Sequence, residues 1–127
     1  MSDQKVLMKK PIAEVIVDFL ECEGVEYVFG VPGVSLVPFF AALNKTGKVK
    51  PILAKHEEGA AFMADGYARV KGRPGVCFAT SGPGVTNLVS GVATAYEDNV
   101  PLIVLSGQVE TSAFGKGVLQ DSTAEGI

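Results

Sequence analysis

Strand-like and helix-like patterns alternate along this chain, and that alternation is the strongest constraint on its fold. Short apolar runs predict four strands, at residues 25–29, 51–54, 76–80 and 102–105. A helical apolar pattern precedes each of them. Short strands that alternate with amphipathic helices are typical of a parallel sheet covered by helices on both faces. We therefore predict an α/β fold with right-handed crossovers between its strands.

Apolar residues three and four positions apart mark the predicted helices. Their apolar faces are Ile12, Val15, Ile16, Phe19 and Leu20; Leu36, Phe39, Phe40 and Leu43; Ala60, Met63, Ala64, Tyr67 and Ala68; and Val85, Leu88, Val89, Val92, Ala93 and Tyr96. Gly24, Gly47 and the breaker cluster 71–75 are expected to end the first three helices. Ser35 is expected to cap the start of the second.

The composition is that of an ordinary globular domain. The chain has 127 residues, of which 47% are hydrophobic and 20% charged, and this length suits one domain. The net charge of −3 argues against a nucleic-acid partner, which would require a basic surface. No apolar run is long enough to span a membrane, and the polar start, residues 1–10, is not a signal peptide. We expect a cytoplasmic protein, or one processed into an organelle.

Two cysteines and one histidine limit the metal and redox chemistry of this chain. Cys22 and Cys77 match no zinc or CxxC spacing, so we expect two buried free thiols in a reducing compartment. His56 is the single histidine, and there is no HExxH motif. We therefore expect no metal site formed by this chain alone.

Glycines and polar residues gather directly after the predicted strands. They occupy residues 30–33, 56–59, 80–84 and 106–108. In a parallel sheet these four turns meet at the carboxyl edge, where open α/β sheets bind their ligands. The sequence therefore predicts a ligand site at this edge.

Glu57 is the most notable side chain of these turns. It leads the apolar face of the third predicted helix, and the small residues Gly59, Ala60 and Ala61 leave room beside it. A binding carboxylate and a simple first-turn acid, which favours the helix dipole, are both consistent with this position. Glu58 lies off the apolar face and fits the second interpretation better.

Two loops also leave alternatives open. The free N–H groups of loop 80–84 could bind a polar group, or the loop could be only a tight strand-to-helix turn. Its Gly82-Pro83-Gly84 segment lacks the third glycine of a dinucleotide fingerprint and follows the wrong strand. Gln120 and Asp121 fit a solvated polar loop unless other information assigns them a role.

Four motifs in order resemble one family, the thiamine-diphosphate enzymes. They are HEEGAAFMADGYAR at 56–69, FGVPG at 29–33, TSGPGVTN at 80–87 and PLIVLSGQV at 101–109. The likeness runs from about Val6 to Ile127 and lies in the acetolactate synthase and pyruvate oxidase branch, most like the acetolactate synthase large subunit. It implies that residues 1–127 are the front part of the pyrimidine-binding (PYR) domain, apparently truncated at the C-terminus, with a sheet edge left for a further strand or a partner.

The resemblance implies a role for Glu57 as the carboxylate that activates the cofactor. The family glutamate maps to Glu57 and hydrogen-bonds ring nitrogen N1′ of the aminopyrimidine, which promotes loss of the proton from C2 of the thiazolium. The cofactor-binding positions carried over are Val31, Gly33, Glu57, Thr80, Gly82 and Asn87. The substrate positions carried over are Val34, Leu119 and Gln120. Val34 replaces a second glycine of many acetolactate synthases, and Leu119 replaces a phenylalanine.

The resemblance also implies cofactors and partners. The family binds thiamine diphosphate, with the diphosphate and Mg²⁺ held by a second domain through a GDG…N motif that residues 1–127 do not contain. It implies a pyruvate-like 2-oxo acid substrate and a homodimer or homotetramer, and leaves a small regulatory subunit and FAD open. Residues 1–127 by themselves are expected to be inactive.

Three other functions stay open beside the leading one, a carboligase or decarboxylase such as acetolactate synthase. The first is a sister enzyme such as pyruvate oxidase or oxalyl-CoA decarboxylase. The second is a non-catalytic PYR-type partner or regulatory module, against which the retained Glu57 argues. The third is a dinucleotide-binding oxidoreductase, in which Glu57 would be the ribose acceptor.

Overall fold

The computed structural model describes residues 10–122. The features noted at residues 1–9, and the end of the chain at Ile127, lie outside this part. The elements, in order, are α1 (Ile12–Cys22), β1 (Tyr27–Gly30), the 3₁₀ turn η1 (Val34–Leu36), α2 (Val37–Thr46), β2 (Lys50–Leu53), α3 (Glu57–Lys71), β3 (Gly75–Ala79), α4 (Pro83–Asn87), α5 (Val89–Glu97) and β4 (Leu102–Ser106).

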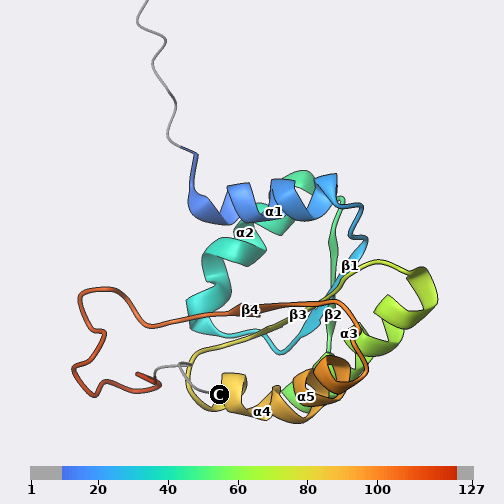
Figure 1. Cartoon of the computed structure of the whole chain (residues 1–127). Coiled ribbons are helices and arrows are strands. Elements are labelled where there is room, and N and C mark those ends of the chain that lie inside the picture. Colours follow the sequence, from blue (N-terminus) through green and yellow to red (C-terminus); the bar gives the residue numbers. More distant parts are fainter. Residues whose placement is uncertain (1–9, 123–127) are drawn as a thin grey trace, which may run out of the picture.

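The strands form one parallel sheet with the order β2-β1-β3-β4. Helices α1 and α2 lie on one side of it and α3, α4 and α5 on the other (Figure 1). The predicted α/β fold, with helices on both faces of a parallel sheet, is confirmed.

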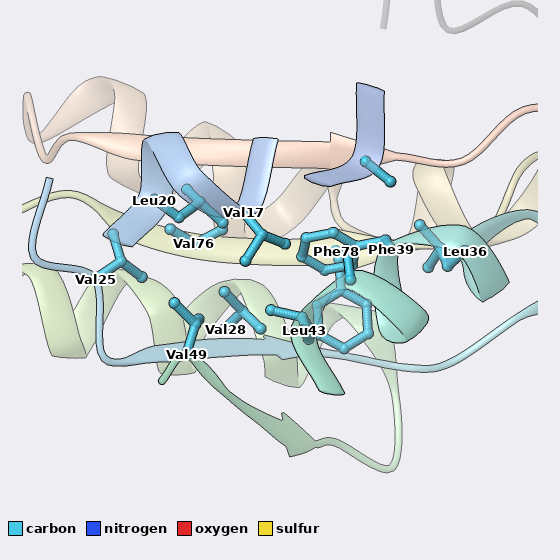
Figure 2. Packing of buried hydrophobic residues seen from close by; sticks show 12 residues of the cluster. Val17, Leu20, Val25, Val28, Leu36, Phe39, Leu43, Val49, Val76 and Phe78 are labelled. Atoms are coloured by element: carbon cyan, nitrogen blue, oxygen red, sulfur yellow. The ribbon is translucent and has the colours of Figure 1, made fainter. Parts of the chain in front are cut away.

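Alternating side chains of the central strands separate two hydrophobic clusters. Val28, Val76 and Phe78 point to the α1 and α2 side, whereas Phe29 and Cys77 face α3. Figure 2 shows the first cluster, in which the sheet residues meet Val17 and Leu20 of α1 and Leu36, Phe39 and Leu43 near and within α2. Because β3 is buried along its whole length, the sheet is held by packing on both faces.

The two outer strands of the described sheet differ in how they are exposed. All four residues of β2 are exposed. Ala54 donates its N–H group to Gly30 of β1, and Lys50 donates to Glu26, the residue directly before β1. Pro51, which has no N–H, therefore occupies an outward-facing position. Strand β4 is partly exposed, and beside it lies an apolar hollow of about 450 Å³ lined by Val104 and by residues of α4 and α5, among them Val92.

Helix α3 is fastened to the α4–α5 segment at both ends. At its start, Asn87 donates a hydrogen bond to Glu57. Near its end, Arg69 pairs with Asp65 within α3 at 2.9 Å and with Asp98, just after α5, at 2.6 Å. These contacts fix how α3 lies along the sheet, and therefore where its first residue is placed.

The predicted apolar face of α1 was partly wrong: Leu20 is buried and Ile16 packs against the core cluster as predicted, but Ile12, Val15 and Phe19 are exposed. Ala13, Val17 and Leu20 are buried, whereas Ile12 is 75% and Phe19 54% exposed. The apolar band of this helix is wide, and the part of it that includes Ala13 and Val17 is the part that packs in the core cluster. The predicted third face was also partly wrong, because Met63 is exposed while Ala61 and Asp65 are buried.

Two further expectations are corrected by the structure. The predicted fourth helix is divided at Leu88 into α4 and α5. Leu88 itself is buried, so the interruption still places an apolar side chain in the core.

The expectation of two buried thiols is also corrected. Cys22 is exposed and only Cys77 is buried, although both are free thiols. Within residues 10–122, no helix is long and apolar enough to cross a membrane.

Replacing Gly91 by alanine should destabilise the protein, because a Cβ at Gly91 would overlap Ala61 of α3. We expect a loss of about 1–3 kcal/mol in the free energy of unfolding, measured by denaturant titration of the intact protein. Gly66→Ala is the matched control, since a Cβ there meets nothing within 4 Å; it should be neutral or stabilise the protein by up to about 1 kcal/mol. Equal effects of the two variants would contradict the close α3–α5 packing.

The two thiols should differ in reactivity. Burial raises the pKa of the Cys77 thiol from 9.0 to about 11. Between these two pH values the thiol stays protonated in the folded protein but ionises in the unfolded protein. Its contribution to stability is present below the unfolded value and is lost as the pH rises through about 11. Iodoacetamide at about pH 9, followed by peptide mass mapping, should label Cys22 in the folded protein and Cys77 only in denaturant. Equal labelling of Cys22 and Cys77 in the folded protein would contradict the burial of Cys77.

Candidate functional site

The strand order of the sheet singles out one point at its carboxyl edge. The chain passes from β1 outward to β2 on one side and from β3 outward to β4 on the other. The strand order therefore reverses between β1 and β3, and ligands of open α/β sheets bind outside the carboxyl ends of the strands at such a point. The loops that follow β1 and β3 are those in which the sequence predicted a site.

Glu57 is the first residue of α3, and only 9% of its surface is exposed. His56 caps the helix, because its Nδ1 accepts a hydrogen bond from the N–H of Glu58. Asn87 Nδ2 donates to Glu57 Oε2 at 3.0 Å, and the helix dipole favours a carboxylate at this end. Glu57 is thus a buried carboxylate held in one orientation, while its neighbour Glu58 is exposed.

The second carboxylate oxygen, Oε1, faces the segment after β3. A Cβ at Gly84 would lie 3.4 Å from Glu57 Oε1 and 3.0 Å from Thr80 Cγ2. Among residues 10–122, no side chain or backbone group donates a hydrogen bond to Oε1. Oε1 therefore keeps its capacity to bond a ligand, and Gly84 keeps the space between Glu57 and Thr80 open.

The loops after β1 and β3 touch each other. A Cβ at Gly33 would overlap the side chain of Thr80. Ser35 Oγ lies 3.0 Å from Thr80 Oγ1 and accepts from the N–H of Ser81 at 3.4 Å. The expectation that Ser35 caps the second helix was therefore wrong: the cap position is Leu36, without a side-chain bond, because the Ser35 hydroxyl bonds across to the neighbouring loop instead.

The loop after β4 reaches back to the same region. Gly82 has a φ of +68°, and a Cβ there would lie 3.1 Å from Gln120 Cα. Gln120 also has a positive φ, 65°, an uncommon conformation for a residue with a side chain. The Asp121 carboxylate accepts N–H bonds from Gly115 and Gly117, and these bonds hold the loop around Gln120.

The structure brings six of the predicted site residues into one region and leaves three outside its contacts. Gathered by the contacts described above are Gly33, Glu57, Thr80, Gly82, Asn87 and Gln120. Val31 is partly buried, whereas Val34 is 87% and Leu119 89% exposed. Val34 lines an open hollow of about 620 Å³ together with Pro32 and Phe40. Within residues 10–122, no group of three acidic, His or Cys side chains could hold a metal ion.

Sequence reasoning missed Ser35 and Gly84 as site residues. A serine just before a helix usually caps it, and the glycines of a strand-to-helix segment such as 80–84 are usually explained by the turn itself. Only the spacing of neighbouring loops reveals the Ser35–Thr80 bond and the proximity of Gly84 to Glu57. No local pattern in the sequence carries that information.

Comparisons with known proteins agree with this geometry. Residues 10–126 match the family model described as thiamine pyrophosphate enzyme, N-terminal TPP binding domain. The chain is 47% identical over its whole length to an acetolactate synthase of Arthrospira platensis. Over 91% of its length it is 48% identical to the acetolactate synthase isozyme 1 large subunit of Escherichia coli, and over 87% it is 46% identical to a chloroplastic acetolactate synthase of Arabidopsis thaliana.

These relatives are much longer than the chain. The aligned part covers 23%, 20% and 16% of their respective lengths, so the chain corresponds to about a fifth of them. The family model, by contrast, matches nearly all of the chain. The fold, the buried glutamate at the carboxyl edge and these matches lead to one conclusion: the chain belongs to the thiamine pyrophosphate enzyme family, as its N-terminal thiamine-pyrophosphate-binding domain.

Proposed function

We propose that this chain is the pyrimidine-binding part of a thiamine-diphosphate-dependent carboligase or decarboxylase that acts on pyruvate-like 2-oxo acids, with acetolactate synthase as the leading identity. The observation that carries the proposal is the buried Glu57 carboxylate, held by Asn87 at the carboxyl edge of the sheet. The similar proteins named acetolactate synthase support the reaction class. The same identity gives the expected partners: a 2-oxo acid substrate and further copies of the subunit, with the diphosphate and Mg²⁺ bound by another domain.

The residues present fit the aminopyrimidine of thiamine diphosphate. Glu57 Oε1 offers an unused acceptor beside Gly84, which suits a hydrogen bond to a ring nitrogen. The side chains around that position are small, since Ala60 and Ala61 are fully buried in the turn that follows Glu57. Backbone groups at Val31 and Gly33, together with Thr80 and Gly82, would hold the other edges of the ring.

Thiamine diphosphate, when bound, supplies the carbon nucleophile that attacks a 2-oxo acid and accepts the electron pair left by decarboxylation. The part of this chain is to hold and move one proton. Asn87 donates to Oε2, so the proton shared with the ring nitrogen resides at Oε1. A ring bound beside Gly84 would shield this oxygen from water, which would strengthen the bond.

Substrate contacts are proposed at Val34, Leu119 and Gln120. Gln120 lies over Gly82 and is thereby close to the proposed ring site. The apolar side chains of Val34 and Leu119 are exposed and are available to a substrate held between this domain and the one that carries the diphosphate.

Glu57→Gln should abolish most activity and leave cofactor binding largely intact. The amide keeps the shape and can still accept from Asn87, but it cannot exchange the proton. We expect acetolactate formation from pyruvate by the intact enzyme to fall about a hundredfold or more, while thiamine-diphosphate affinity changes little. Glu58→Gln, in the same helical turn but exposed, is the matched control and should keep normal turnover. Near-normal turnover by Glu57→Gln would refute the assignment.

Asn87→Ala should lower turnover by about tenfold, the cost expected for a lost hydrogen bond to a charged group. The reason is that Glu57 Oε2 loses its 3.0 Å donor and the carboxylate can rotate. The turnover number and the thermal midpoint should be measured together. Asn44→Ala, at an exposed site of α2, serves as control. A fall in the thermal midpoint without a fall in turnover would contradict an orienting role.

A further inference from the structure

Ser35 lies where helix caps are usually found but does not act as one. It belongs to the 3₁₀ turn η1, directly before α2, and the cap residue of α2 is Leu36, with no side-chain hydrogen bond. A serine cap stabilises a helix by typically ~1 kcal/mol. The Ser35 hydroxyl makes no such cap bond to α2 and instead forms hydrogen bonds with two other groups. Its position is therefore set by something other than the stability of α2.

Those two groups belong to the loop after β3. Ser35 Oγ lies 3.0 Å from Thr80 Oγ1 and accepts from the N–H of Ser81 at 3.4 Å. Ser81 is buried, with 2% of its surface exposed, and buried N–H groups are nearly always paired. Ser35 thus satisfies a buried donor and spans the point between β1 and β3 where the strand order reverses.

A third loop closes over the same hydroxyl. Gly107 follows β4, and a Cβ on it would overlap Ser35 Oγ and lie 2.7 Å from Ser35 Cβ. The N–H of Gly107 donates to Ala79 O at 2.9 Å, which ties this loop to the end of β3. The ends of β1, β3 and β4 therefore meet at one serine side chain.

Among the contacts of residues 10–122, the hydrogen bonds of the Ser35–Thr80 pair leave one hydroxyl donor without a partner. Either hydroxyl can donate to the other. If Ser35 donates, the Thr80 proton is unused; if Thr80 donates, Ser35 accepts twice and its own proton is unused. In both arrangements one hydroxyl proton remains for an acceptor atom of a ligand beside Gly33 and Thr80.

We propose that Ser35 is a positioning residue for the cofactor: its hydroxyl joins the loop of Gly33 to that of Thr80 and so sets the distance between these two loops at the proposed ring site. The inference rests on the proposed function, because it is Thr80 and Gly33 that would meet the ring. Ser35 acts through Thr80, so its removal weakens cofactor binding rather than the chemical step. A spacer that only supports the fold would instead lower stability, independently of Thr80.

The test compares Ser35→Ala, Ser35→Thr, Thr80→Val and the double variant Ser35→Ala/Thr80→Val in the intact enzyme. Thiamine diphosphate, with Mg²⁺ present, is titrated calorimetrically, and turnover is measured at saturating cofactor. Amide hydrogen exchange of residues 80–84 is measured without cofactor. Ser90→Ala, at an exposed position of α5, is the control and should match the wild type in all three measurements.

We expect Ser35→Ala to weaken cofactor binding roughly tenfold, the effect of one or two lost hydrogen bonds. Turnover at saturation should stay within about twofold, exchange at residues 80–84 should rise, and Ser35→Thr, which keeps the hydroxyl, should restore affinity. The affinity of the double variant for thiamine diphosphate should equal that of whichever single variant binds it less tightly, because the two side chains act as one unit.

Two results would overturn the role of Ser35. One is wild-type affinity and exchange in Ser35→Ala; the other is a loss of cofactor affinity in the double variant that equals the sum of the two single losses. The wild-type titration separates this from the function itself. An intact wild-type enzyme that fails to bind thiamine diphosphate refutes the proposed function and the role of Ser35 with it, whereas normal wild-type binding with an unaffected Ser35→Ala refutes only the latter.

Discussion

The site depends on how closely α3 can approach the sheet and α5. That approach is made possible by small residues, since Ala60, Ala61 and Ala64 are fully buried. A Cβ on Gly75 of β3 would overlap the backbone of Ala64, and one on Gly91 of α5 would overlap Ala61. Van der Waals contact between backbones, rather than between large side chains, therefore determines the position of the helix. Glu57 is the first residue of this helix, so the packing of the helix also fixes the position of the Glu57 carboxylate.

Polar contacts at the carboxyl edge depend on this packing and refine it. The bond from Asn87 to Glu57 needs α3 and α4 side by side, and the pair of Arg69 with Asp98 holds the other end of α3 in place. Hydrogen bonds to charged groups contribute more than neutral ones when they are buried. The Asn87 bond is the more buried of the two, and it acts on the carboxylate to which the proposed chemistry is assigned.

Local pattern predicted the elements and the edge that carries the site, because periodicity and breakers are short-range properties. The sheet, its helices on both faces and the ends of α2 and α3 at Gly47 and Gly72 follow from such signals. The rotation of α1 does not, since a wide apolar band allows several faces and tertiary packing selected the one with Ala13 and Val17. The contact of Ser35 with Thr80 is likewise set by the distance between two loops that are 45 residues apart.

The outer strand β2 is poorly suited to pair with an additional strand, whereas the other outer strand, β4, is not limited in this way. Pro51 lies in an outward position of β2, so it costs the pairing with β1 nothing but denies an incoming strand one hydrogen bond. β4 is Leu-Ile-Val-Leu-Ser, without a proline, and an apolar hollow lies beside it. The two outer strands of the described sheet therefore differ. Pro51 makes β2 a poor partner for a further strand, as in other protected sheet edges, whereas β4 can still form backbone hydrogen bonds along its free side.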